Sequence, residues 1–203
     1  MQEVVQKIRK NLRLSMNGIA SSLMREKGVD YKLNFGVSIP RLRQMAKQYA
    51  PNKALAETLW KEQTRELKIL ATLIYPPEEF ALASVWIEDI DNQELAEQAS
   101  MNLFCKMPDA LFYASGWTKQ DAIYPLICGF SVYNRLMMNG LTMNRQEADV
   151  FIQSAITAFH HESLGVKQGV INALDRFFTQ SPEQSEYLQS KLTAEKELLE
   201  FMI

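Results

Sequence analysis

Cysteine, histidine and long apolar runs are scarce in this sequence, and each scarcity excludes a class of protein. The two cysteines, Cys105 and Cys128, lack CxxC spacing, so we expect buried free thiols and no disulfides. No apolar run reaches the roughly 18–20 residues of a membrane helix. The first residues, MQEVVQKIRKNLRLS, lack the apolar stretch of a secretory signal. We therefore predict a cytoplasmic protein that does not span a membrane.

Common catalytic and cofactor motifs are also missing. The only histidines, His160 and His161, precede Glu162 without the HExxH spacing of a zinc site. A Ser-His-Asp triad would have to use one of this pair. Neither a GxGxxG motif nor a GKS or GKT phosphate loop occurs. We expect no metal ion and no cofactor.

The small net charge of −2 over 203 residues hides a strong asymmetry. Residues 1–68 contain 14 basic and 6 acidic residues, a net charge of +8, whereas the remainder contains 8 basic and 18 acidic residues, a net charge of −10. A basic end of this kind indicates polyanion binding, and the alternative is that these residues only solvate outer helix faces. The acidic remainder argues against a long surface that wraps DNA, because phosphate contacts need local positive charge.

Strand patterns are weak, and helical periodicity dominates. Apolar residues recur at i, i+3, i+4 and i+7, the spacing of one helix face, in several segments. Four of these sets are Leu67, Leu70, Ala71, Ile74; Ile123, Leu126, Ile127, Phe130; Ile152, Ala155, Ile156, Phe159; and Val170, Ala173, Leu174, Phe177. Pro125 predicts a kink in the helix that follows Lys119.

Loop signals divide these segments into helix pairs of similar size. The predicted pairs are Asn52 to Tyr75, Glu78 to Met107, Asp109 to Asn139 and Arg145 to Gln180, with a lone helix from Ser181 onward. Repeated pairs of this length are typical of a HEAT-type solenoid, in which neighbouring pairs bury each other's apolar faces. The predicted fold class is all-α, an α-α superhelix of HEAT-like helix pairs, with residues 1–203 forming a single domain.

The segment NFGVSIPRLRQMAK, Asn34 to Lys47, is the most distinctive in the chain. Ser38 is a favourable helix N-cap, Pro40 lies where a helix tolerates a missing N–H, and Gly36 permits an unusual backbone turn. Together with LAETLWKEQTRELKILATLIY, Leu55 to Tyr75, this segment resembles the DNA alkylation repair family, the AlkD-type DNA glycosylases built from HEAT-like repeats.

The resemblance implies duplex DNA as the partner. In the family, alkylated purines are excised without a metal or cofactor: a carboxylate stabilises the developing sugar cation, tryptophans contact the lesion nucleotide and an arginine holds the backbone. Second helices of the pairs, expected to begin near Arg65, Glu94, Lys119 and Lys167, would line the concave side. We predict phosphate contacts from seven basic residues: Arg41, Arg43, Lys47, Arg65, Lys68, Lys119 and Lys167.

One local match to the family's Trp-Asp-x-x-Asp motif occurs in GWTKQD. Trp117 and Asp121 have i, i+4 spacing, which would place both on one helix face, but Thr118 replaces the intervening acidic residue. The ordinary alternative is a packed tryptophan at a helix start, followed by an exposed first-turn aspartate.

Counting helix pairs gives a different register, which we favour because the pairs must stack in order. Leu95 and Ala99 then occupy the tryptophan and catalytic aspartate positions. In the family pattern an arginine follows one repeat after this motif, and a further tryptophan one repeat after the arginine. Asp121 stands at the arginine position, and Asn172 stands at the position of the last tryptophan. Glu94 or Glu97 could substitute as the carboxylate.

These observations predict a DNA-binding member of the family whose catalytic constellation is degraded or absent. Two alternatives remain open. The first is an active alkylpurine (N3- or N7-) DNA glycosylase, and the second is a non-enzymatic scaffold that binds a protein partner on its concave face.

Overall fold

The computed structural model describes residues 1–26 and 31–201, and the chain divides into two compact units, Met1–Leu82 and Ala83–Ile203. All regular elements in the described residues are helices, apart from one isolated bridge between Leu33 and Thr64. The predicted all-α class is therefore confirmed. The single domain over residues 1–203 stays a prediction, and each unit is described by itself.

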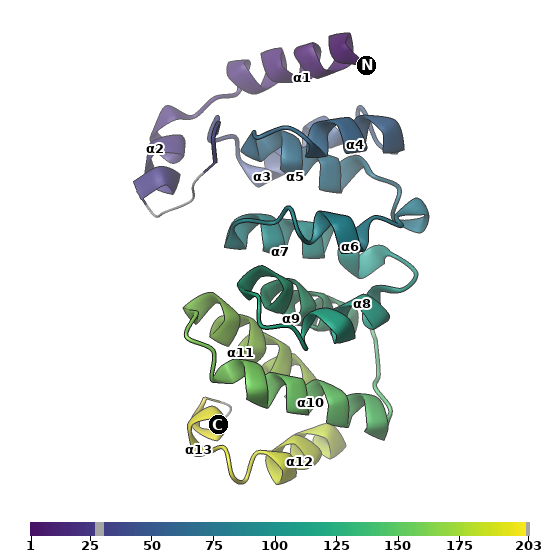
Figure 1. Cartoon of the computed structure of the whole chain (residues 1–203), viewed down its shortest axis with the longest axis vertical. Coiled ribbons are helices and arrows are strands. Elements are labelled where there is room, and N and C mark those ends of the chain that lie inside the picture. Colours follow the sequence, from purple (N-terminus) through teal and green to yellow (C-terminus); the bar gives the residue numbers. More distant parts are fainter. Residues whose placement is uncertain (27–30, 202–203) are drawn as a thin grey trace. The chain divides into compact units, whose positions relative to one another are not determined.

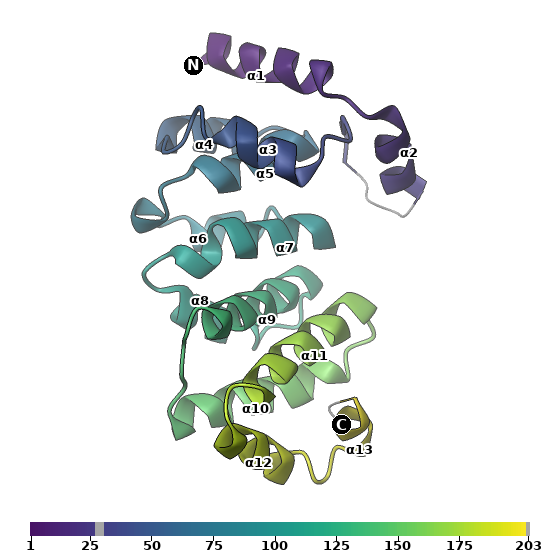
Figure 2. The same cartoon turned by 180° about the vertical axis from the view of Figure 1, so that it is seen from behind.

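Unit 1 holds two N-terminal helices followed by a packed group of three. Helix α5 packs against both α3 and α4, and α1 lies alongside this group in both views (Figures 1 and 2). The bounds are α1 Gln2–Leu14, α2 Gly18–Glu26, α3 Ile39–Ala46, α4 Lys53–Trp60, α5 Arg65–Ile74 and the 3₁₀ turn η1 Pro77–Glu79.

Unit 2 is organised around α9, which packs against α7, α8 and α11. Helix α11 also packs against α10 and α12. The bounds are α6 Ala83–Trp86, α7 Gln93–Asn102, η2 Phe104–Lys106, α8 Ala110–Trp117, α9 Ile123–Met138, α10 Arg145–Phe159, α11 Leu164–Phe178, α12 Pro182–Lys191 and α13 Lys196–Glu200.

Local capping explains where several helices begin. Asn52 accepts a hydrogen bond from the Leu55 amide at the start of α4, and Asn92 does the same for Leu95 in α7. Asn144 and Glu147 form a reciprocal capping box on α10. Because such caps satisfy amides that the helix itself leaves unpaired, they fix the helix starts that the loop signals predicted.

The helix boundaries differ from prediction between α8 and α9. Helix α8 ends at Trp117 and α9 begins at Ile123, so no helix begins near Lys119. Pro125 is the third residue of α9, which runs unbroken to Met138. The expected kink is wrong, because a proline in the first turn has no helical carbonyl partner to lose.

The two cysteines are buried free thiols, as predicted. Burial raises the pKa of the Cys128 thiol to about 12. The helices of the described residues are each too short or too polar to cross a lipid bilayer.

Candidate functional site

Three exposed residues of the predicted phosphate-contact set lie on α3 or at its C-cap. Arg41, Arg43 and Lys47 are all exposed. Arg41 donates from Nη1 to Gln44 Oε1 at 2.6 Å and from Nε to Ser15 Oγ at 3.4 Å. Ser38 is the N-cap residue, as predicted, with an extended backbone and no side-chain capping bond. Arg41 therefore lies beside the turn between α1 and α2.

A buried ion pair holds the segment before α3 in place. The Glu66 carboxylate accepts hydrogen bonds from the amides of Phe35 and Val37, at 3.1 and 3.2 Å. Arg65 Nη1 donates to the Val37 carbonyl at 2.9 Å and to Glu66 Oε1 at 3.0 Å. Both charged side chains are almost fully buried, so the pair is structural, and it joins the two sequence segments that carry the family resemblance.

Gly36 lets this segment touch the α1–α2 turn. Its φ is +69°, and a Cβ added there would lie 2.2 Å from the Asn17 carbonyl oxygen. The Asn17 amide donates to the Phe35 carbonyl at 2.9 Å, and Ser21 Oγ donates to the Asn34 carbonyl at 2.8 Å. The unusual turn predicted at Gly36 thus anchors the start of α2.

Two predicted phosphate contacts do not have the outward position expected of them. Arg65 is 1% exposed and Lys68 is 4% exposed. The Arg65 guanidinium is held by Glu66 and Val37, and the Lys68 ammonium lies 4.9 Å from the centre of the Trp60 ring. Neither residue is a candidate phosphate contact in the folded protein, because a buried cation that is already bound cannot meet a phosphate without leaving its partners.

The remaining two basic candidates belong to unit 2. Lys119 is exposed in the turn between α8 and α9, where it lines a groove of about 860 Å³ together with Asp121 and the α10 side chains. Lys167 is half-buried on α11, with its Nζ 5.4 Å from the centre of the Phe159 ring. These two lysines stand on a unit with 8 basic and 16 acidic residues, a net charge of −8.

The predicted pairing of Trp117 with Asp121 on one helix face is wrong. Trp117 is the last residue of α8 and is 3% exposed, with its ring 5.0 Å from Phe104 and 5.7 Å from Tyr113. Asp121 is exposed in the turn that precedes α9. The chain reverses between them, and they line different cavities.

A polar cavity of about 340 Å³ lies on the face formed by α7, α9 and α11. Its lining is rich in amides, with one carboxylate and one guanidinium, and the polar members are Gln93, Glu97, Gln98, Ser131, Asn134, Arg135, Gln168 and Asn172. Glu97 accepts a hydrogen bond from Gln93 at 2.8 Å, and Asn172 accepts one from Gln168 at 2.9 Å. The i, i+4 spacing of these polar pairs is the sequence signal that could have indicated this surface.

The favoured register placed Leu95, Ala99 and Asn172 at the family's functional positions. Leu95 and Ala99 are fully buried, so they do not line this cavity, whereas Asn172 does. Of the two candidate carboxylates, Glu97 lines the cavity and Glu94 is half-buried outside it.

All three tryptophans of the chain are buried, with Trp60, Trp86 and Trp117 each 3% exposed. No indole among them is therefore available to stack against a nucleotide at the surface of this structure.

The histidines take part in local contacts. His160 Nε2 lies 3.3 Å from Glu195 Oε2, and His161 Nδ1 accepts a hydrogen bond from the Ser163 amide at 2.9 Å. Across residues 1–26 and 31–201, no three histidine, cysteine or acidic side chains converge as a metal site would require.

Comparison with known proteins gives a family and a fold. The family model described as DNA alkylation repair enzyme matches residues 8–133. A solved structure from a new family of proteins related to the HEAT-like repeat DNA glycosylases, with affinity for branched DNA structures, aligns with a TM-score of 0.83. The alignment covers 97% of this chain and 82% of that chain at 16% identity, so it establishes the HEAT-like fold. No curated protein matches this sequence.

Proposed function

The chain belongs to the DNA alkylation repair enzyme family, and from this premise we propose that it binds DNA, prefers branched DNA to linear duplex and does not excise bases. The observation that supports the proposal is the set of exposed basic residues on α3 and at its C-cap. Arg41, Arg43 and Lys47 stand on a unit with 14 basic and 8 acidic residues, a net charge of +6. Such a local surplus favours contact with phosphates.

The preference for branched DNA is suggested by the structural relative. That protein shares the fold of this chain and has affinity for branched DNA structures. A contact surface confined to unit 1 fits this preference, since a compact basic patch can meet several strands where they converge. It needs no long continuous groove.

The loss of excision is supported by the absence of a suitable pair of side chains in the described residues. Excision in the family, as the resemblance implies, needs tryptophans against the nucleotide and a carboxylate near the sugar. Here every tryptophan is buried, and the acidic residue of the one local motif match, Asp121, lies apart from Trp117. Glu97 is the carboxylate of the amide-lined cavity, and no aromatic residue of the described chain lines that cavity.

Binding is tested by fluorescence anisotropy with a four-way DNA junction and a linear duplex of the same sequence. We expect the wild-type protein to bind the junction more tightly, and R41A/K47A to weaken binding to both DNAs by roughly tenfold, because two phosphate contacts are lost. The matched control is K106A/K196A, which removes two exposed lysines of unit 2 and should leave both affinities unchanged. Absence of binding by the wild-type protein at low salt would remove the proposal.

Excision is tested separately, with duplex DNA that contains N7-methylguanine or N3-methyladenine. We expect no base release above the spontaneous rate, even with protein in large excess. Release at a faster rate would establish the alternative, an active alkylpurine glycosylase, and E97Q would then show whether Glu97 supplies the carboxylate.

A second candidate function, a scaffold for a protein with a basic surface, has its support in the net charge of −8 on unit 2. It predicts that affinity purification returns one basic protein free of nucleic acid. Retention of DNA binding in the purified protein would count against it.

A further inference from the structure

Unit 1 exposes four large apolar side chains within ten residues at the junction of α1 and α2. Leu14 is 78% exposed, Met16 60%, Ile19 77% and Leu23 49%. A single exposed leucine is ordinary on a protein surface, but a local group of large apolar side chains marks an interaction site. We call these four residues the apolar tip.

Hydrogen bonds to the segment before α3 hold the backbone of the apolar tip in place. Asn17, in its centre, is bound through its amide to the Phe35 carbonyl, and its side chain accepts a hydrogen bond from the Ala20 amide at 3.0 Å. Ser21, on the inner side of α2, is buried and bonded to Asn34. The segment that begins at Asn34, with Gly36 in close contact with Asn17, therefore positions the apolar tip.

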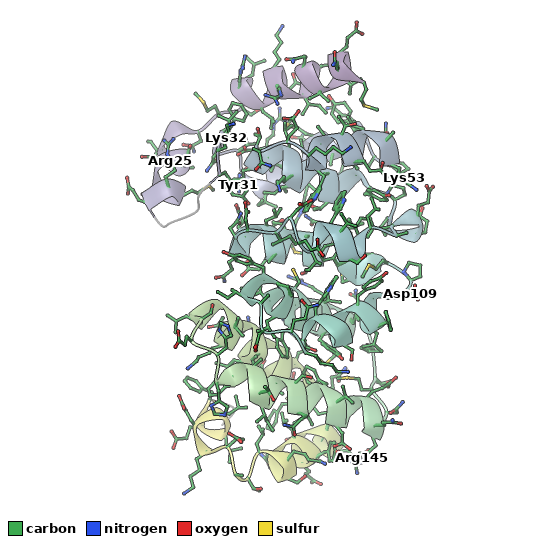
Figure 3. All side chains as sticks on the ribbon, viewed as in Figure 1. Arg25, Tyr31, Lys32, Lys53, Asp109 and Arg145 are labelled. Carbon is green, nitrogen blue, oxygen red and sulfur yellow. The ribbon has the colours of Figure 1, made fainter. Side chains whose placement is uncertain are left out.

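Several exposed basic residues belong to the same two helices as the apolar tip or contact the turn between them. Lys10 and Arg13 are exposed at the end of α1, and Arg25 is exposed on α2, where Figure 3 labels it. Arg41 reaches the tip from α3 through its hydrogen bond to Ser15, which lies between Leu14 and Met16. The nearest acidic group on α2 is Glu26, which accepts from Ser22 at 3.4 Å. Exposed apolar side chains next to basic side chains match a partner that offers both phosphate groups and accessible apolar surfaces.

We infer that the apolar tip packs against the unstacked base faces at a branch point of DNA, while the nearby arginines and lysines bind the adjoining phosphates. This inference rests on the proposed function and adds the element that distinguishes branched from linear DNA. In a linear duplex the base faces are stacked against one another and are inaccessible, whereas stacking is interrupted where strands exchange. Minor-groove-binding proteins insert apolar side chains between the base steps of a continuous duplex and must supply the free energy of unstacking. Where stacking is already interrupted, that cost is smaller.

The inference is tested with the variant L14Q/I19Q, which removes the two most exposed apolar side chains of the tip and keeps every charge. We expect its affinity for the four-way junction to fall by roughly tenfold or more, because the burial of two aliphatic side chains against the bases is lost, while its affinity for the linear duplex stays unchanged. The matched control is F112Q/L164Q, which replaces two side chains of unit 2 that are 75% and 81% exposed. This control should leave both affinities as in the wild type.

A second measurement reports on the base contact itself. With 2-aminopurine at the branch point, wild-type protein should raise the fluorescence, because the base leaves its stacked neighbours. L14Q/I19Q should not raise it. Circular dichroism would verify that the variant keeps its helices.

The outcomes separate this inference from the proposed function. If the wild type binds junction and duplex but L14Q/I19Q keeps the full junction preference, the apolar tip has no role at branch points and the proposed function stands. If the wild type binds neither DNA, both are overturned. In a third outcome, the wild type dimerises or binds phosphatidylserine vesicles, L14Q/I19Q loses that property, and the junction preference is unchanged. This outcome would assign the tip to a second copy of the chain or to a membrane surface, and it would overturn the inference.

Discussion

At the scale of single residues, Gly36 is the glycine whose surroundings leave the least room for a side chain. Its φ of +69° is unfavourable for any residue with a Cβ, and that Cβ would meet the Asn17 carbonyl at 2.2 Å and the Ser21 amide at 2.7 Å. Backbone atoms on both sides cannot yield as a flexible side chain would. We expect Gly36→Ala to lower the free energy of unfolding by about 2–4 kcal/mol, the combined cost of strain and overpacking.

Urea denaturation followed by circular dichroism would measure this change. The control is Gly116→Ala in α8, where a Cβ would meet nothing within 4 Å. Because alanine favours a helix over glycine, this control should be neutral or stabilising by up to about 1 kcal/mol. Equal stabilities of the two variants would contradict the close approach of the Gly36 segment to the α1–α2 turn.

A buried and a partly exposed ion pair of unit 1 can be compared directly. Arg65 and Glu66 are almost fully buried, whereas Arg9 and Glu62, 2.6 Å apart, have side chains that are 25% and 32% exposed. We expect Arg65→Met to destabilise the protein by about 3–5 kcal/mol, because it leaves the Glu66 carboxylate buried without its cation. Arg9→Met should cost less than about 1 kcal/mol. Urea midpoints of the two variants test this ranking, and a larger shift for Arg9→Met would refute it.

At the scale of elements, α12 is tied to α10 by a polar cluster. Lys191 Nζ lies 2.7 Å from Asp149 Oδ1, and the Tyr187 hydroxyl also donates to Asp149. The hydrogen bond from Lys191, followed by that from Tyr187, lowers the pKa of Asp149 below its ordinary value, and the bond to Asp149 raises the pKa of Lys191. The cluster therefore stabilises α12 while both groups are charged.

The signs of these shifts define a pH window. Because the pKa of Asp149 is lowered in the folded protein, its contribution to stability is complete at pH values above the ordinary carboxyl pKa of 3.8. This contribution is lost as the pH falls through the lowered pKa of the folded protein. Because the pKa of Lys191 is raised in the folded protein, its contribution to stability is complete at pH values below the ordinary lysine pKa of 10.5. This contribution is lost as the pH rises through the raised pKa of the folded protein. We expect amide protection of α12, corrected for intrinsic exchange, to fall below about pH 4. Asp149→Asn should weaken protection at neutral pH and remove this dependence, whereas Asp175→Asn, on the exposed side of α11, should leave it intact.

The sequence predicted which segments are helical better than it predicted where each helix begins and ends. Apolar spacing correctly indicated the pairs α4–α5 and α10–α11, since the apolar positions that recur along each helix are mostly buried. Helix α5 buries polar positions as well, so the spacing did not report the full extent of its burial. It failed at TKQD, the turn between α8 and α9, which contains neither glycine nor proline. There Thr118 is buried, and its methyl group would lie 2.6 Å from a Cβ at Gly129 of α9. A tertiary contact thus sets the turn, and local periodicity does not report it.

The candidate site was harder to predict for a related reason. Sequence patterns assign charged residues to the surface, yet Arg65 and Lys68 are buried on α5 by contacts that only the folded unit supplies. The same rule assigns Leu14 and Ile19 to the core, although both are exposed. Arg41 and Arg43 of α3 and Lys47 at its C-cap are exposed, as a phosphate contact requires, because the helix buries a single face through Leu42, Met45 and Ala46.

At the scale of the whole molecule, the division of charge determines how binding depends on salt. Unit 1 carries +6 and unit 2 carries −8, so the protein as a whole does not attract DNA, and affinity must come from phosphates placed close to the basic residues of unit 1. Each such contact releases condensed counterions and adds about 0.9 to the steepness of log affinity against log salt. We therefore expect a steep decline for the wild type and a slope that is smaller by about two for R41A/K47A.

Titrations of the linear duplex between about 50 and 200 mM salt provide the measurement. The variant K106A/K196A should keep the wild-type slope, because its two lysines belong to the acidic unit. L14Q/I19Q should also keep it, since the change removes no charge. If R41A/K47A kept the full slope while K106A/K196A lost it, the phosphate contacts would belong to unit 2. The division of charge would then have no bearing on DNA binding.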